Sequence, residues 1–202
     1  MKFTLLQRTL WTLAVAAVVA FGSLMLWTEY RGNTARSVKE PAFRADFELT
    51  DHRGKSRTDE EFTGRWMLIF FGFSNCPDVC PTTLAEVAAV MDGLGAKANQ
   101  VQPFFISVDP KRDTPAALAE FVPRFEAGII GLTGTPDQIA QTAKSFHIFT
   151  EKIEEAAAPD GYTVGHSSQL FLFDPSGGYV KSWPYGTPAE DVLADLKERV
   201  AR

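Results

Sequence analysis

The stretch "MLIFFGFSNCPDVCPTTLAEVAAVMDGL", residues 67–94, decides the fold. Its first seven residues, Met67 to Phe73, are a continuous apolar run, which is typical of a strand buried on both faces of a sheet. After the cysteines, apolar residues recur at helical spacing, at Leu84, Val87, Val90, Met91 and Leu94. The sequence therefore predicts a buried strand that leads into a helix through a short loop holding Cys76 and Cys80.

The segments around this unit extend the same pattern. "PFFISVD", residues 103–109, predicts a second buried strand, and the alternation of strands with helices indicates an α/β sheet with parallel members. Three Thr-Pro pairs, at residues 114–115, 135–136 and 187–188, predict helix starts, because the hydroxyl caps the helix and proline suits its first position. Turn signals predict two antiparallel hairpins, around residues 51–54 and 174–178, and an exposed loop at residues 154–163.

Length and composition limit the function classes. A chain of 202 residues has room for one domain and an accessory segment. The net charge of −5 argues against nucleic-acid binding, because phosphate binding relies on a surplus of Lys and Arg. Only two cysteines occur, and a domain of this size does not need them as a disulfide scaffold.

The N-terminal segment has a different character. Residues 9–28 carry no charge, and about 20 apolar residues are what a membrane-spanning helix needs. Trp11 and Trp27 lie near its two ends, as expected at membrane interfaces. A cleaved signal peptide is the alternative, but its apolar region is shorter and ends in small residues, whereas this one ends in Leu26 and Trp27.

We therefore predict three parts: a tail and transmembrane anchor at residues 1–28, a polar tether at residues 29–44, and a folded domain at residues 45–202. Basic residues flank the apolar run on both sides, so the positive-inside rule does not settle its orientation. Long domains translocate largely regardless of such charges, and we expect the tail in the cytoplasm and the domain outside. The expected location is the bacterial inner membrane facing the periplasm, or the mitochondrial inner membrane facing the intermembrane space.

The two cysteines stand at the predicted start of a helix. Pro81 follows Cys80, and a residue before proline is disfavoured in the helical region, so we expect the helix to begin at about Pro81. Cys80 would then lie at the helix N-terminus, where the helix dipole lowers a thiol pKa and favours the thiolate. Cys76, in the preceding loop, is close enough to join Cys80 in a disulfide or around one metal ion.

The supply of ligands narrows the choice of metal. Structural zinc takes four Cys or His ligands, which two cysteines and three histidines hardly provide, whereas two thiolates and one imidazole suit copper. His52 lies in a distant predicted hairpin, and His147, in "SFHIF", is expected in the core. His166 precedes a strand and is the histidine most easily placed at the sheet edge of the cysteine loop, although spacing alone leaves this open.

Three motifs resemble the Sco/SenC family of membrane-anchored copper chaperones for cytochrome c oxidase assembly. "FGFSNCPDVCPTTL", residues 71–84, is similar to the family's F-G-F-x-x-C-P-D-x-C-P signature. "SVDPKRDTP", residues 107–115, is similar to its S-V-D-P-x-R-D-T stretch, in which we interpret Asp109, Arg112 and Asp113 as turn and cap residues. "YTVGHSSQLFLFDPSG", residues 162–177, resembles the segment with the metal-binding histidine.

The resemblance implies a thioredoxin-like α/β sandwich, with a mixed central sheet flanked by helices and extra hairpins. It implies copper, as Cu(I) or Cu(II), held by Cys76, Cys80 and His166. The implied partner is subunit II of cytochrome c oxidase, whose binuclear copper centre receives the metal and whose cysteines the Cys76–Cys80 pair would also reduce. Other copper chaperones and thiol reductants are further implied partners.

One position departs from the family pattern. Family members commonly carry Asp directly before the histidine, where this chain has Gly165, so copper affinity or partner contact can differ. Two alternatives to a copper chaperone remain open at this point. One is a thiol-disulfide oxidoreductase or peroxiredoxin-like enzyme that uses Cys76 and Cys80 as a catalytic redox pair, and the other is a redox sensor that works without copper.

Overall fold

The structure is a computed structural model that describes residues 21–22 and 43–200. The predicted anchor and tether lie almost entirely outside these residues. Within the part that is described, no helix is long and apolar enough to cross a membrane.

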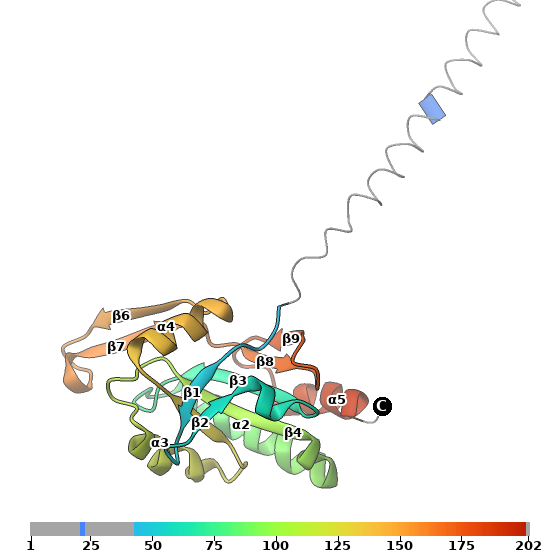
Figure 1. Ribbon diagram of the computed structural model, residues 1–202, viewed down its shortest axis with the longest axis horizontal. Helices are drawn as coiled ribbons and strands as arrows, with labels where there is room; N and C mark the ends of the chain where they lie inside the picture. Colours follow the sequence, from blue (N-terminus) through green and yellow to red (C-terminus); the bar gives the residue numbers. More distant parts are fainter. Residues whose placement is uncertain (1–20, 23–42, 201–202) are drawn as a thin grey trace, which may run out of the picture. The chain divides into compact units, whose positions relative to one another are not determined.

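The centre of the domain is a mixed seven-stranded sheet with the strand order β2-β1-β5-β4-β3-β8-β9 (Figure 1). Strands β3, β4 and β5 are parallel neighbours, and the pairs β1·β2, β1·β5, β3·β8 and β8·β9 are antiparallel. The strands of this sheet are β1 (Glu48–Asp51), β2 (Ser56–Thr58), β3 (Trp66–Gly72), β4 (Val101–Ser107), β5 (Ile130–Thr133), β8 (Leu170–Phe173) and β9 (Tyr179–Trp183). The predicted mixed α/β sheet is confirmed, including both hairpins.

Helices cover the sheet on both sides. In Figure 1, α2 and α3 lie in the lower part of the domain and α4 in the upper part, and α5 packs against α2. The α-helices are α2 (Val79–Leu94), α3 (Pro115–Phe121), α4 (Pro136–Ser145) and α5 (Ala189–Val200). Short 3-10 helices are η1 (Asp59–Phe62), η2 (Gly95–Gln100), η3 (Val122–Phe125) and η4 (Pro159–Gly161).

Two of the three Thr-Pro starts behave as predicted. The hydroxyls of Thr114 and Thr135 accept hydrogen bonds from backbone N–H groups in the first turns of α3 and α4. The third helix, α5, begins at Ala189, and the N–H of Ala189 donates to the Glu86 carboxylate on α2 at 2.9 Å. That start is therefore stabilised by a neighbouring helix.

The core forms around β3 and β4, the two strands predicted to be buried. Phe70 pairs with Phe105 on β4 and with Leu170 on β8, so β3 is enclosed by neighbours along both edges. Aromatic side chains fill much of the space on the two faces. The fully buried phenylalanines are Phe70, Phe71, Phe104, Phe105, Phe146 and Phe173.

A second, two-stranded sheet differs from the expectation for its segment. Strands β6 (Thr150–Glu154) and β7 (Tyr162–His166) form an antiparallel hairpin, and the segment predicted as an exposed loop is largely its tip, with η4. Every residue of β6 is exposed, so no apolar periodicity marks it in the sequence. Tyr162, which was placed in that loop, is 4% exposed.

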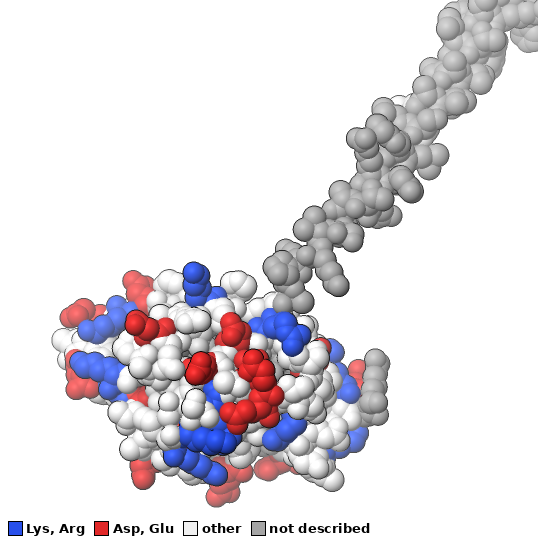
Figure 2. Space-filling view, viewed as in Figure 1, with Lys and Arg blue, Asp and Glu red and all other residues white. Residues whose placement is uncertain are grey.

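Figure 2 shows the charged side chains on one face of the domain. On the face shown in Figure 2, Lys and Arg side chains are interspersed with Asp and Glu side chains. A nucleic-acid surface instead gathers Lys and Arg in one patch or stripe. This face therefore presents no continuous basic surface.

Candidate metal centre

Cys76 and Cys80 lie at the carboxyl end of β3, as the strand-loop-helix prediction requires. Helix α2 begins at Val79, however, two residues before the predicted start, and Pro81 is its third residue. Proline is tolerated there because the first N–H groups of a helix have no intrahelical partner to lose. Cys80 is consequently inside the first turn and fully buried, whereas Cys76 is half-buried in the loop.

Both cysteines are free, and Cys76 Sγ contacts the backbone of Cys80. The backbone N–H of Cys80 donates to Cys76 Sγ at 3.4 Å. The hydrogen bond between the thiols lowers the pKa of Cys76 to about 5. The same hydrogen bond and burial raise the pKa of Cys80, so the pair shares one proton, which Cys80 holds. The expected lowering of the Cys80 pKa is wrong: the hydrogen bond to Cys76, together with burial, raises it, and the thiolate belongs to Cys76.

His166 reaches the cysteines from the end of β7. Its Nε2 lies 3.8 Å from Cys80 Sγ, and its ring makes edge contacts with Phe70 and Phe73, at centroid distances of 6.3 and 5.8 Å. On the other side of the ring, Nδ1 lies 2.9 Å from the carbonyl oxygen of Ser167. A carbonyl only accepts, so Nδ1 carries the hydrogen, and the lone pair of Nε2 faces Cys80.

The distance between Cys80 and His166 is compatible with a shared metal ion. Bonds of about 2.3 Å to sulfur and about 2.0 Å to nitrogen, at an angle of about 120°, separate the two ligand atoms by about 3.7 Å. The observed 3.8 Å between Cys80 Sγ and His166 Nε2 is close to this value. Nevertheless, no cluster of three or more Cys, His, Asp or Glu residues in the described range is arranged to hold a metal. The set of soft thiolates and one imidazole has the chemistry that copper prefers.

The other two histidines are elsewhere. His52 lies at the turn between β1 and β2, where its Nδ1 accepts a hydrogen bond from the N–H of Gly131 at 3.1 Å. His147 is exposed, with a φ of 54°, in the turn after α4, and its ring contacts Phe43. The expectation of a buried core His147 is wrong, because this left-handed turn directs the chain between two buried residues, Phe146 and Ile148, and leaves His147 outside.

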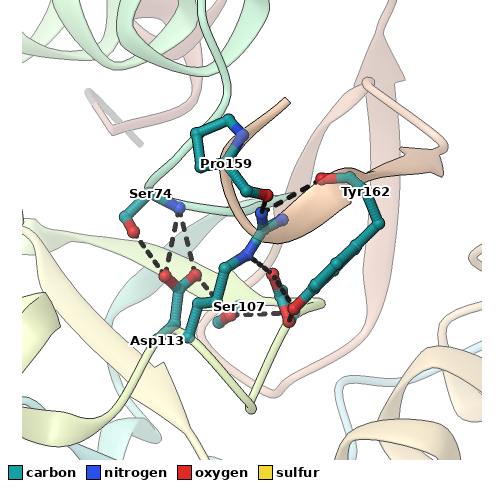
Figure 3. A network of polar contacts seen from close by, with 7 residues as sticks. Ser74, Ser107, Asp113, Pro159 and Tyr162 are labelled. Carbon is teal, nitrogen blue, oxygen red and sulfur yellow. Dashed lines mark hydrogen bonds and ion pairs between the residues drawn. The ribbon is translucent and has the colours of Figure 1, made fainter. Parts of the chain in front are cut away.

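A buried polar network lies beside the cysteine loop (Figure 3). Asp109, Arg112 and Asp113 make more contacts in it than the turn and cap roles predicted for them would require. The Asp113 carboxylate accepts hydrogen bonds from the Ser74 backbone N–H at 3.0 Å and from the Ser107 hydroxyl at 2.6 Å. Asp109 forms an ion pair with Arg112 and accepts a hydrogen bond from the Tyr162 hydroxyl at 3.0 Å. The sequence contained Asp109, Arg112 and Asp113 in one motif, but it did not show that Asp109 and Arg112 contact Tyr162 of the β6–β7 hairpin.

The fold and the site define a thioredoxin-like protein in which a Cys-x-x-x-Cys pair meets a histidine from a separate hairpin. Solved structures with this fold include ScoI of Arabidopsis thaliana with copper bound, with a TM-score of 0.73 and 34% identity over 79% of this chain and 99% of that one. ScoI of Bradyrhizobium japonicum with copper bound has a TM-score of 0.71 and 38% identity over 78% of this chain and 99% of that one.

Sequence comparison gives the family. The SCO1/SenC family model matches residues 35–201. The mitochondrial SCO2 homolog of Bos taurus is 34% identical over 94% of this chain and 75% of its own length. The mitochondrial SCO1 homolog of Homo sapiens is 35% identical over 80% of this chain, which spans 54% of that protein's length. The chain belongs to the SCO1/SenC family.

Proposed function

We propose that this protein is a copper chaperone that serves the assembly of cytochrome c oxidase. The observation that carries the proposal is the approach of His166 Nε2 to Cys80 Sγ at 3.8 Å, with Cys76 in contact with Cys80. Copper is the cargo of this site, held by the two sulfurs and the imidazole. Relatives of known structure bind copper, and another relative is described as a member of the Sco family of cytochrome c oxidase assembly proteins.

The site suits a carrier because its ligands can bind copper without burying it completely. The Cys76 thiolate is available at neutral pH, while Cys80 must lose its proton when copper binds. The half-buried Cys76 and His166 leave the copper within reach of a partner's ligands. The receiver in this proposal is the binuclear copper centre of oxidase subunit II, with other copper chaperones as sources.

Copper titration of the reduced protein tests the three-ligand site. We expect about one copper per chain, with the sulfur-to-copper charge-transfer absorption of thiolate ligation. His166→Ala should lower the affinity about 10- to 100-fold and shift that absorption, whereas His147→Ala, which removes an exposed imidazole, should not. Unchanged binding in His166→Ala would contradict the proposal.

The position of the protein in the cell is part of the same proposal. Residues 9–28 form an anchor in the inner membrane, residues 29–44 form a tether, and the domain from residue 45 lies in the periplasm or the intermembrane space. This side of the membrane allows the domain to meet the exposed copper centre of subunit II. Protease accessibility of the domain in intact spheroplasts, compared with lysed ones, tests this placement.

Thiol-disulfide exchange is a second candidate function, favoured by the adjacent free cysteines and the thiolate of Cys76. Cys76 would attack a partner's disulfide, Cys80 would resolve the mixed disulfide, and the partner would leave reduced. A relative at 27% identity is described with a disulfide switch. If reduction of the partner is the main task, reduction should survive His166→Ala and stop in Cys76→Ser.

A further inference from the structure

The histidine of the site stands on an element that backbone pairing does not attach to the main sheet. Among the described strands, β6 and β7 pair with each other and form a separate sheet. His166 is the last residue of β7, and β6 is exposed along its whole length. Side-chain contacts must therefore hold this hairpin against the domain.

Arg112 supplies such contacts from the loop between β4 and α3. Its Nη1 donates to the carbonyl oxygens of Pro159 and Tyr162, at 3.0 and 3.1 Å, which lie at the tip and at the start of β7. Its guanidinium lies 3.9 Å from the centre of the Tyr162 ring. One side chain thus binds the hairpin through two hydrogen bonds and a cation-π contact.

The same loop is also fastened to the cysteine loop. Asp109 forms an ion pair with Arg112 and accepts a hydrogen bond from the Tyr162 hydroxyl. Asp113 binds the backbone N–H of Ser74, two residues before Cys76. The segment from Asp109 to Asp113 therefore contacts both halves of the candidate metal centre.

Phe73 connects Arg112 to the imidazole directly. The Arg112 guanidinium carbon lies 5.7 Å from the centre of the Phe73 ring, and the His166 ring packs edge-on against the same ring at 5.8 Å. If Arg112 were displaced, the hairpin would lose its contacts to this loop, and the Phe73 ring that packs against His166 would be able to move. Packed side chains transmit such shifts because interiors have little spare volume.

The energetics favour a positioning role over a purely stabilising one. The Arg112 side chain is 8% exposed and its partner Asp109 is 5% exposed. Within the described residues, Arg112 Nη2 has no hydrogen-bond partner. Replacement of a buried ion pair by apolar residues of the same volume is often neutral or stabilising, so stability alone does not account for the Arg112–Asp109 pair. Its benefit is a defined geometry.

We infer that Arg112 is a positioning residue, which sets the distance between His166 and the cysteines by fixing the β6–β7 hairpin. This inference rests on the proposed copper site for its functional meaning, but the geometry it describes exists without copper. Arg112 touches neither the metal nor its ligand atoms in this assignment. It acts through Tyr162, Phe73 and the hairpin backbone.

The test uses the reduced full-length protein and the variant Arg112→Lys, which keeps the charge beside Asp109 but loses the planar fork. Arg57→Lys is the matched control, because Arg57 likewise joins Asp51 and Glu61 but on the β1–β2 hairpin. We expect Arg112→Lys to lower copper affinity about tenfold, as outer-shell substitutions do, and Arg57→Lys to leave it unchanged.

A double-mutant cycle separates positioning from general weakening of the fold. If Arg112 acts through His166, Arg112→Lys should cause no further loss of copper affinity in the His166→Ala background. Additive losses would overturn the inference. Tyr162→Phe, which removes one hydroxyl and keeps the ring, should lower the affinity in the same direction by a smaller factor.

Nuclear magnetic resonance of the metal-free protein makes the inference independent of the proposed function. Wild type should show proton cross-relaxation between the rings of His166 and Phe73, which pack together. This signal should weaken in Arg112→Lys and persist in Arg57→Lys. Unchanged ring contacts in Arg112→Lys would overturn the positioning role. Copper binding that is the same in wild type and in His166→Ala would overturn only the proposed function.

Discussion

The cysteine loop and the β6–β7 hairpin supply the two halves of one site but are secured differently. The loop follows β3, which has strands along both edges, and leads into α2, which packs on α5. The hairpin pairs only within itself among the described strands and exposes all of β6. Backbone pairing and the core thus fix the cysteines, while side chains fix His166.

This difference assigns separate physical tasks to the two halves. The cysteines need a fixed separation for both copper binding and disulfide formation, which a strand-loop-helix unit provides. A histidine held by side chains can change its distance from the cysteines without unfolding the domain, which suits the release of copper in the function proposed above. Substitutions in one half, or in the contacts that link the halves, should therefore have different effects.

Removing the link should give the largest effect. Asp109→Ala leaves the Arg112 guanidinium buried without its carboxylate, so we expect the free energy of unfolding to fall by about 3–5 kcal/mol. Denaturant unfolding followed by circular dichroism measures this change. Asp51→Ala is the comparison, because its partner Arg57 is 21% exposed and keeps Glu61, and we expect a smaller loss of about 1–3 kcal/mol. Equal losses would mean that burial of the Asp109 pair has no special weight.

The lowered pKa of the Cys76 thiol should be measurable in a pH titration. The Cys80 thiol lowers the pKa of Cys76 to about 5, so alkylation of Cys76 in the reduced protein should show a midpoint near that pH instead of about 8.5. The lowered pKa of Cys76 stabilises the fold above the unfolded thiol pKa, and this contribution is lost as the pH falls through about 5. The raised pKa of Cys80 has the opposite effect above about pH 8.5, so the pair contributes most near that pH. The midpoint is the proper readout, because a thiolate of low pKa is also less nucleophilic.

Cys80→Ala supplies the control for that titration, since it removes the thiol that donates to Cys76. The alkylation midpoint should then rise toward about 8.5. His166→Ala should move it much less, because the imidazole contributes less to the lowered pKa than Cys80 does. A wild-type midpoint near 8.5 would contradict the shared proton.

Substitution of one glycine in each half compares how tightly the cysteine loop and the β6–β7 hairpin are packed. A Cβ added at Gly72 would lie 2.7 Å from Cys80 Sγ and 2.8 Å from Phe105 Cε2, so Gly72→Ala should cost about 1–3 kcal/mol of unfolding free energy through overpacking. A Cβ at Gly165 would meet the end of the exposed Ile153 side chain at 3.1 Å, which can move. Gly165→Ala should therefore change stability by no more than about 0.5 kcal/mol. Thermal unfolding of both variants checks the contrast.

The sequence predicted the cysteine half well because its physics is local. The apolar run from Met67 to Phe73 and the helical spacing after Pro81 are visible in one continuous segment, and the structure differs by only two residues at the start of α2. The thiol pKa values were not predictable, since burial and the contact between Cys76 and Cys80 depend on the folded arrangement.

The hairpin half was much less predictable. Strand β6 carries charged and exposed residues without alternation, so nothing in its sequence distinguishes it from a loop. The sequence favoured His166 over the other histidines as the third ligand, but it could not show that His166 lies next to Cys80. That position depends on contacts such as the one between Arg112 and Tyr162, which are 50 residues apart in sequence. Only the resemblance to a family joined the residues into one site.

Gly165 offers the finest test of the hairpin. It stands directly opposite Glu151 in the β6–β7 register, so Gly165→Asp, which introduces the residue that resembles the family pattern, places two carboxylates across from each other. Like charges in such a pair should destabilise the hairpin by about 0.2–1 kcal/mol relative to Gly165→Asn, which has the same shape without charge. Amide hydrogen exchange of β6 and β7 at low and high salt measures this difference, which should shrink as salt screens the repulsion. If Asp and Asn protect the hairpin equally at low salt, Glu151 does not oppose a carboxylate at position 165, and glycine there has no electrostatic advantage.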